Sequence, residues 1–99
     1  MYLIQLLLPA TRNAATDAGF ARTRRELINA FSGVTAYTRA PAKGVWLAGD
    51  GAEEQDEMVL VEVLAEDFHR SWWRSYERKL ARRFKQEEVH VRAFPVERL

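Results

Sequence analysis

The most hydrophobic stretch of the chain runs from Met58 to Leu64, and Glu62 is the only polar residue in it. Successive residues of a strand point to opposite faces of the sheet, so this segment is apolar on both faces apart from one carboxylate. Strands of this kind are typical of the middle of a sheet that is covered on both sides. The pattern therefore predicts a central strand from Met58 to Ala65.

Three further strands follow from the same pattern and are expected at residues 2–8, at residues 34–39 continuing at 44–48, and at residues 89–96. Pro41 interrupts the second of these strands. Because proline cannot donate a hydrogen bond to a neighbouring strand, its presence predicts an edge strand with a bulge or bend. The polar residues 49–56 predict a hairpin loop.

Apolar residues at helical spacing predict a first helix that carries Phe20, Leu27 and Phe31 on one stripe, with Ile28 at its edge. Asp17 or Thr16 is expected to cap its start, and Gly33 is expected to end it in a left-handed conformation. Arg24 lies inside the stripe. Either its stem covers apolar surface while its head reaches water, or its guanidinium points into a pocket.

A second helix is expected to begin at Asp67 and to close at Glu87 and Glu88. Spacings of three and four place its apolar and aromatic residues on one face, namely His69, Trp73, Tyr76, Leu80 and Phe84. Trp72 lies beside this stripe and should flank the core. A row of aromatic residues at this spacing is a predicted core face, because each ring buries a large area.

The order strand, helix, strand, strand, helix, strand predicts a single α+β domain over residues 1–99. Its simplest packing is ferredoxin-like, a four-stranded antiparallel sheet with both helices on one face. Right-handed crossovers would place the first and third strands in the centre of the sheet and the other two at its edges.

The strands of this sheet each have one purely apolar face and one face that mixes apolar with polar residues. We assign the apolar faces to the helices. The other side, called the open face below, gathers Leu3, Gln5, Leu7, Leu60, Glu62, Leu64, His90, Arg92 and Phe94. Monomers rarely expose apolar patches larger than roughly a few hundred Å². We therefore expect a homodimer in which a second copy covers the open face.

The V-L-V-E-V strand that leads into a long aromatic helix, the glycine expected to stop the first helix, and the mixed open face together resemble the dimeric α+β barrel superfamily. In that superfamily two ferredoxin-like sheets face each other. The resemblance spans nearly the whole chain and implies a dimer of the kind found in small monooxygenases, isomerases and many bacterial proteins. It places no catalytic signature on particular residues of this chain.

Composition narrows the function classes further. The 99 residues include no cysteine, which excludes disulfides and thiolate metal sites and fits a cytoplasmic protein. The apolar start of the chain, at seven residues, is far shorter than the roughly 20 that span a bilayer, so no membrane association is expected. The central strands lack the aromatic residues with which an RNA-recognition domain stacks bases, so nucleic acid is not the expected partner.

The net charge of +1 is unevenly distributed, because acidic residues dominate positions 50–67 and basic residues dominate positions 70–85. The two blocks are expected to neutralise each other or to remain solvated. Four arginines recur every four residues along the second helix: Arg70, Arg74, Arg78 and Arg82. Together with Arg83, this ridge supports an alternative function, a basic helix that contacts nucleic acid or an acidic protein.

The polar residues of the open face are the candidate site of a small-molecule binding protein or a cofactor-independent enzyme. Glu62, His90 and Arg92 are the catalytic candidates, and the expected ligand-binding residues are Gln5, Glu62, Arg92 and Arg24. No metal or cofactor is expected. Desolvation in an apolar setting would raise the pKa of Glu62 and suit a general base. Alternatively, Glu62 pairs with Arg92, with Gln5 or with a symmetry mate and has a structural role.

Overall fold

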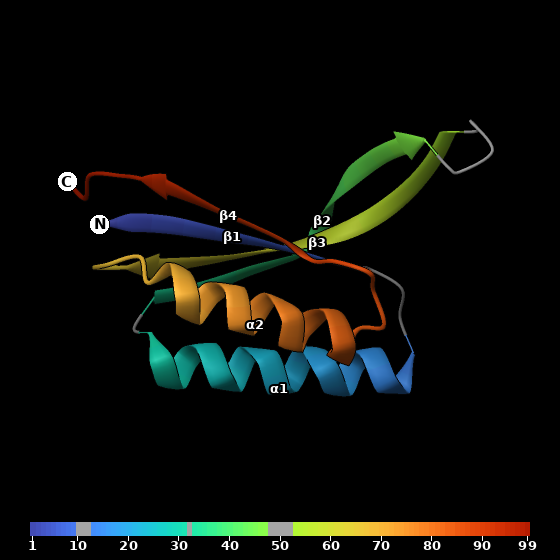
Figure 1. Cartoon of the computed structure of the whole chain (residues 1–99), viewed down its shortest axis with the longest axis horizontal. Coiled ribbons are helices and arrows are strands. Elements are labelled where there is room, and N and C mark those ends of the chain that lie inside the picture. The colour runs from blue at the N-terminus through green and yellow to red at the C-terminus, as the bar shows by residue number, and fades with distance from the viewer. Residues whose placement is uncertain (10–12, 32, 48–52) are drawn as a thin grey trace.

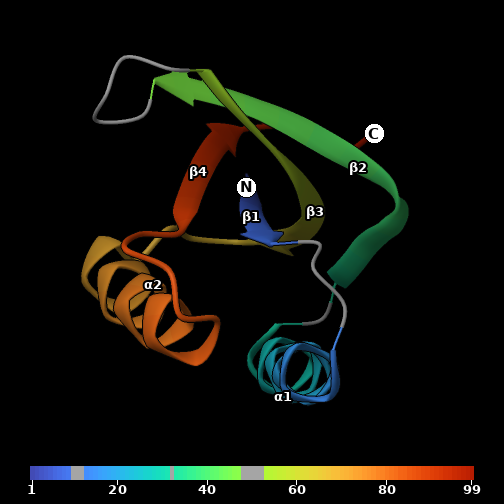
Figure 2. The same ribbon diagram turned by 90° about the vertical axis from the view of Figure 1, so that its right-hand side faces the viewer.

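The computed structural model describes residues 1–9, 13–31, 33–47 and 53–99, and for residues 33–47 and 53–57 it describes the backbone only. The elements follow the order β1 (Tyr2–Pro9), α1 (Ala14–Ala30), β2 (Gly33–Leu47), β3 (Glu53–Ala65), α2 (Arg70–Arg83) and β4 (His90–Pro95). The antiparallel strands form one sheet in the order β2-β3-β1-β4, and both helices lie on the same side of it (Figures 1 and 2). The predicted α+β class is confirmed.

The central strands β1 and β3 pair over their whole shared length, with Gln5 opposite Glu62 at the midpoint. Their alternation decides what is buried. One set of side chains faces the helices and is shielded from solvent, and it comprises Ile4, Leu6, Leu8, Val59, Val61, Val63 and Ala65. The assignment of the purely apolar faces to the helices is therefore confirmed for these two strands.

The helices cover this sheet face with Leu27 from α1 and with Trp73, Tyr76, Leu80, Ala81 and Phe84 from α2 and its end. The two helices approach closely at Gly19, where an added Cβ atom would lie 3.1 Å from the ring of Phe84. A larger residue at this position would require the Phe84 ring to move by a few tenths of an ångström. The predicted stripe on α2 is confirmed except for His69, which is exposed, and Trp72 flanks the core at 41% exposure, as predicted.

The helix ends differ from the prediction. α1 begins one turn earlier than expected, because the side chain of Asn13 accepts a hydrogen bond of 2.8 Å from the backbone N–H of Thr16. It ends at Phe31, whose backbone is extended, and Gly33 is the first residue of β2 and not a helix cap. The pattern of apolar residues does not locate a cap, which depends on one local side-chain bond.

α2 begins after His69, which makes no side-chain capping bond, so Asp67 is not its cap. The helix stops at Arg83, four residues before the predicted end at Glu87. Lys85 adopts φ 53°, and the N–H groups of Lys85 and Gln86 bond to the carbonyls of Arg82 and Ala81. This is a Schellman motif with lysine in the position that glycine usually occupies, which explains why no stop signal is visible in the sequence there.

β2 and β3 continue past the rest of the sheet as a two-stranded arm that bends away from the helices (Figures 1 and 2). Their register shifts between Tyr37 and Ala42, which confirms the bulge expected at Pro41 on an edge strand. The predicted loop at residues 49–56 is too long, because β3 already begins at Glu53. The rest of that loop, residues 49–52, lies outside the described residues.

No helix in the part of the chain that the structure describes is long and apolar enough to cross a membrane.

Candidate functional site

The open face is organised in three rows that run across the sheet. In the middle row, β3 contributes Glu62, β1 contributes Gln5 and β4 contributes Arg92. The rows on either side are mainly apolar: Leu60, Leu7 and His90 form one, and Leu64, Leu3 and Phe94 form the other. The polar groups thus lie in a line between two bands of leucine.

Glu62 and Gln5 form a direct contact in the middle row. The side-chain amide nitrogen of Gln5 donates a hydrogen bond of 2.9 Å to Oε2 of Glu62. Both side chains are half-buried. Of the partners considered for Glu62, Gln5 is one that the structure shows, and the bond fixes the direction in which the carboxylate points.

Arg92 lies opposite Gln5 on the other side of β1, and its side chain is exposed. No ion pair joins it to Glu62 within the described part of the chain. His90 is also exposed and lies 3.7 Å from the carboxylate of Glu88, outside the middle row. The structure therefore brings Gln5 and Glu62 together and leaves Arg92 and His90 beside them, without a contact to the carboxylate.

The apolar rows are only partly shielded from solvent. Leu64 is 39% exposed and Phe94 is 43% exposed, whereas Leu3, Leu7 and Leu60 are half-buried. The core on the helix side contains residues of the same types with almost no exposure. The apolar residues of the open face are therefore of the types found in the core but are only partly shielded from water.

Arg24 does not belong to this site. It lies on α1, on the opposite side of the sheet, and its side chain is exposed. Its exposure agrees with the first of the two interpretations, in which the guanidinium reaches water. On the same helix, Thr23 and Leu27 are the residues that face the core.

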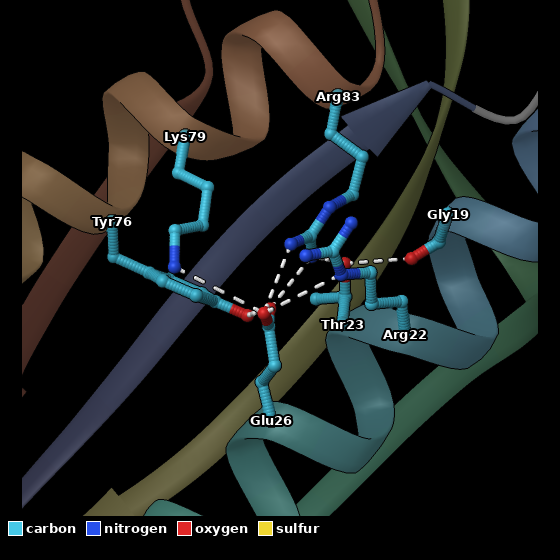
Figure 3. Close-up of polar contacts among 7 residues, drawn as sticks. All are labelled: Gly19, Arg22, Thr23, Glu26, Tyr76, Lys79 and Arg83. Carbon is cyan, nitrogen blue, oxygen red and sulfur yellow. Dashed lines mark hydrogen bonds and ion pairs between the residues drawn. The ribbon is translucent and has the colours of Figure 1, made fainter.

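A second polar cluster joins the two helices, and sequence reasoning did not predict it. Arg83 from α2 donates hydrogen bonds to both oxygens of Glu26 on α1, at 2.7 and 3.0 Å, and a third to the hydroxyl of Thr23 at 2.7 Å. The hydroxyl of Tyr76 donates to the same carboxylate at 3.0 Å (Figure 3). This set, Thr23, Glu26, Tyr76 and Arg83, is called the interhelical cluster below.

The cluster holds its carboxylate in the ionised form. Hydrogen bonds from Arg83 lower the pKa of Glu26, and they do so against the opposing effect of burial. Burial, followed by the bond to Glu26, raises the pKa of Tyr76 to about 12. The hydrogen bond with Glu26 raises the pKa of Arg83. Two further cations approach Glu26 more loosely, Arg22 at 3.8 Å and Lys79 at 4.0 Å.

These contacts indicate a structural connection between the helices. Arg83 donates three hydrogen bonds to side chains of α1, its side chain is only 10% exposed, and Glu26 is 29% exposed. A hollow of about 180 Å³ beside the cluster is lined by Glu26, Trp72, Ser75, Tyr76 and Lys79. Because Glu26 already accepts bonds from two partners on α2, its carboxylate is occupied before any ligand arrives.

The signal that could have revealed the cluster is a pair of helical spacings. Tyr76 and Arg83 are seven residues apart on α2, and Thr23 and Glu26 are three apart on α1, so each pair shares a helix face. Sequence reasoning assigned Arg83 to the basic ridge, and this assignment is wrong. The other members of the ridge, at positions 70, 74, 78 and 82, are exposed as expected.

Within the described residues, no group of three or more histidine and carboxylate side chains lies close enough together to hold a metal ion.

A scan against protein-family models finds no family that matches the chain, and a search of curated proteins finds no match either. Among solved structures, the chain is similar to a phage SAM lyase in its apo state, with a TM-score of 0.55 and 15% sequence identity. The likeness covers 94% of this chain and 78% of that one. At this identity it concerns the fold alone, so the chain shares with that enzyme a related arrangement of helices and strands.

Proposed function

We propose that this chain is a ferredoxin-like subunit that pairs with a second copy through its open face, in the manner of the dimeric α+β barrels, and binds a small molecule between the two sheets. The observation that carries the proposal is the position of Glu62. Its carboxylate is half-buried between two leucine rows, is oriented by Gln5 and has no described cation of its own chain as a partner. A charge in such a place is costly unless a partner or ligand neutralises it.

The exposed apolar rows support the dimer part of the proposal. A second copy would remove Leu64 and Phe94 from water, and each Å² of apolar surface so buried contributes about 25 cal/mol. Two facing sheets lie about 10 Å apart, and interdigitating side chains fill this space, so a small ligand would have to occupy a local gap between side chains and another layer of structure would not fit.

The polar row supports the ligand part. A carboxylate flanked by apolar surface binds cationic groups and hydrogen-bond donors of a small molecule, while the leucines hold its apolar portion. A carboxylate in this position also accepts a proton from a bound substrate, so the same site suits a cofactor-independent enzyme. One solved structure of similar fold is that of a phage SAM lyase. For this reason the first compound to test is S-adenosylmethionine, which carries a sulfonium and an ammonium group.

A thermal-shift panel of amino acids, amines and S-adenosylmethionine tests this proposal on the wild type and on Glu62→Gln. Gln at this position keeps a hydrogen-bonding partner for Gln5 and removes the charge. We expect at least one compound to raise the wild-type Tm, by on the order of 10 °C at 100 times its Kd, and to leave Glu62→Gln unchanged.

The matched control is Glu87→Gln, an exposed carboxylate outside the site, which should respond like the wild type. The proposal that Glu62 binds a ligand would be contradicted if no compound shifted the Tm, or if the Tm of the wild type and of Glu62→Gln shifted equally.

A further inference from the structure

The three polar residues of the middle row are placed symmetrically about β1. Gln5 lies on β1 itself, Glu62 lies one strand away on β3, and Arg92 lies one strand away on the other side, on β4. Neighbouring strands are about 4.8 Å apart, so the backbones of Glu62 and Arg92 are separated by about 10 Å, with Gln5 between them. This separation explains why the two charges do not meet within one chain.

A second copy can bring opposite charges together in only one of the simple two-fold arrangements of facing sheets. When the two-fold axis runs parallel to β1 above Gln5, each Glu62 faces Arg92 of the partner subunit. When the axis instead runs across the strands along the middle row, Glu62 faces the partner's Glu62, and the arginines face each other. Like charges placed opposite one another are destabilising, which favours the first arrangement.

The apolar rows fit the same axis. Leu3 and Leu7 of β1 then face the partner's Leu3 and the partner's Leu7, and Leu64 faces the partner's Phe94. These contacts pair apolar groups on both sides of Gln5, which itself faces the partner's Gln5, whereas Leu60 faces the partner's His90. Facing sheets usually cross at about 30°, which is small enough to keep the middle rows together near the axis.

We propose that the site is shared between two subunits, with Glu62 and Gln5 from one chain and Arg92 from the partner, and that it takes the zwitterionic head of an α-amino acid. The carboxylate of Glu62 suits an ammonium group, and the planar guanidinium of the partner's Arg92 suits a carboxylate, which it can bind through two parallel hydrogen bonds. The leucine rows on either side suit an apolar side chain. This inference rests on the proposed dimer and specifies its axis and its ligand class.

Charge-swap variants test the axis by light scattering, with circular dichroism to confirm folding. Glu62→Arg alone and Arg92→Glu alone each place like charges opposite one another, and both should be monomers. A mixture of the two variants should form a heterodimer. In that heterodimer the arginine introduced at position 62 of one chain faces the glutamate introduced at position 92 of the other. The unchanged Arg92 of the first chain likewise faces the unchanged Glu62 of the second. The double variant E62R/R92E should be a homodimer on its own.

The outcomes separate this inference from the proposed function. A monomeric wild type contradicts the dimer itself. A dimeric wild type whose single swaps stay fully dimeric, or whose mixture stays monomeric, contradicts the shared site while the dimer stands.

Cross-linking tests the axis without changing any charge. The chain has no native cysteine, so Leu3→Cys and Leu7→Cys each introduce a single thiol. A short bifunctional maleimide that spans sheets about 10 Å apart should join each variant to itself in high yield. Glu87→Cys is the control and should not cross-link. If a dimer forms and neither β1 variant cross-links, the axis does not run along β1.

Three probes test the ligand class on the wild-type dimer: L-methionine, L-methionine amide and N-acetyl-L-methionine. The amide lacks the carboxylate that Arg92 would bind, and the N-acetyl compound lacks the ammonium group that Glu62 would bind. We expect only L-methionine to raise the Tm and expect Arg92→Met to abolish that shift. No shift with L-methionine, or equal shifts with all three probes, contradicts the assignment.

Discussion

Two regions of this molecule each contain a glutamate and an arginine, and they use them in opposite ways. In the interhelical cluster, Glu26 and Arg83 are joined by two hydrogen bonds, and Thr23 and Tyr76 occupy further donors and acceptors. On the open face, Glu62 accepts one bond from Gln5, and Arg92 is exposed on the far side of that residue.

The difference shows which charges are already paired within the chain and which are not. A partly buried ion pair with several hydrogen bonds holds two elements of one chain together, and removing either partner is costly. A half-buried carboxylate without a cation in its own chain is stabilised most by a cation from a partner subunit or a ligand.

The two faces of β3 should respond very differently to the same charge. Val61→Asp places an unpaired carboxylate under the helices, at a position that is 5% exposed, and should prevent folding. Leu60→Asp, one residue earlier, places it on the open face and should leave a folded monomer. Circular dichroism and sizing distinguish the two, and the reverse behaviour would mean that the faces are misassigned.

Removing the guanidinium of the interhelical cluster should destabilise the fold substantially. Arg83→Met keeps much of the aliphatic stem but leaves Glu26 with Tyr76 as its main partner. We expect a loss of about 2 kcal/mol in the free energy of unfolding, or roughly 10 °C in Tm. Arg24→Met on α1 is the matched control, since its side chain is exposed, and should change stability by less than about 0.5 kcal/mol. Equal effects in both variants would show that the cluster adds nothing.

The same cluster should set the pH range of stability at both ends. The pKa of Glu26 is lowered in the folded state, so its contribution is present above the unfolded pKa and is lost as pH falls through the folded value. The pKa of Tyr76 is raised to about 12, so its contribution is present below the ordinary pKa of tyrosine, about 10, and is lost as pH rises from there toward 12.

Unfolding by urea at a series of pH values checks both limbs. Glu26→Gln should flatten the acid limb, and Tyr76→Phe should flatten the alkaline limb. If a variant shows the same dependence of the free energy of unfolding on pH as the wild type, other groups cause that limb of the pH profile.

The exposed arginines of α2 should matter least. Arg74→Met and Arg78→Met are expected to change the free energy of unfolding by less than about 0.5 kcal/mol, because both side chains are exposed. Binding to a DNA duplex should be undetectable near physiological salt. Salt-sensitive DNA binding that both substitutions weaken would favour the alternative of a basic interaction helix.

Sequence periodicity predicted the α+β class and the buried face of β1 and β3, and it placed Gln5 among the candidate partners of Glu62, because alternation along a strand determines which residues share a face. It did not predict the helix ends. Those depend on the capping bond of Asn13 and on a left-handed Lys85, which are single local contacts.

The interhelical cluster was missed for a different reason. Glu26 and Arg83 are 57 residues apart, and their contact depends on how two helices cross, with Gly19 allowing the close approach. The spacings within each helix place Tyr76 with Arg83 and Thr23 with Glu26, but they do not show that the two faces meet. The open face was found because its pattern lies within strands, whereas the cluster arises only after packing.

Pairing through the open face is tested most directly by the mass of the wild-type protein in solution, measured by light scattering at low micromolar concentration, beside that of Leu60→Asp. The open face predicts twice the 11.5 kDa chain mass for the wild type and the single-chain mass for the variant. A wild-type mass of 11.5 kDa at this concentration would contradict the account.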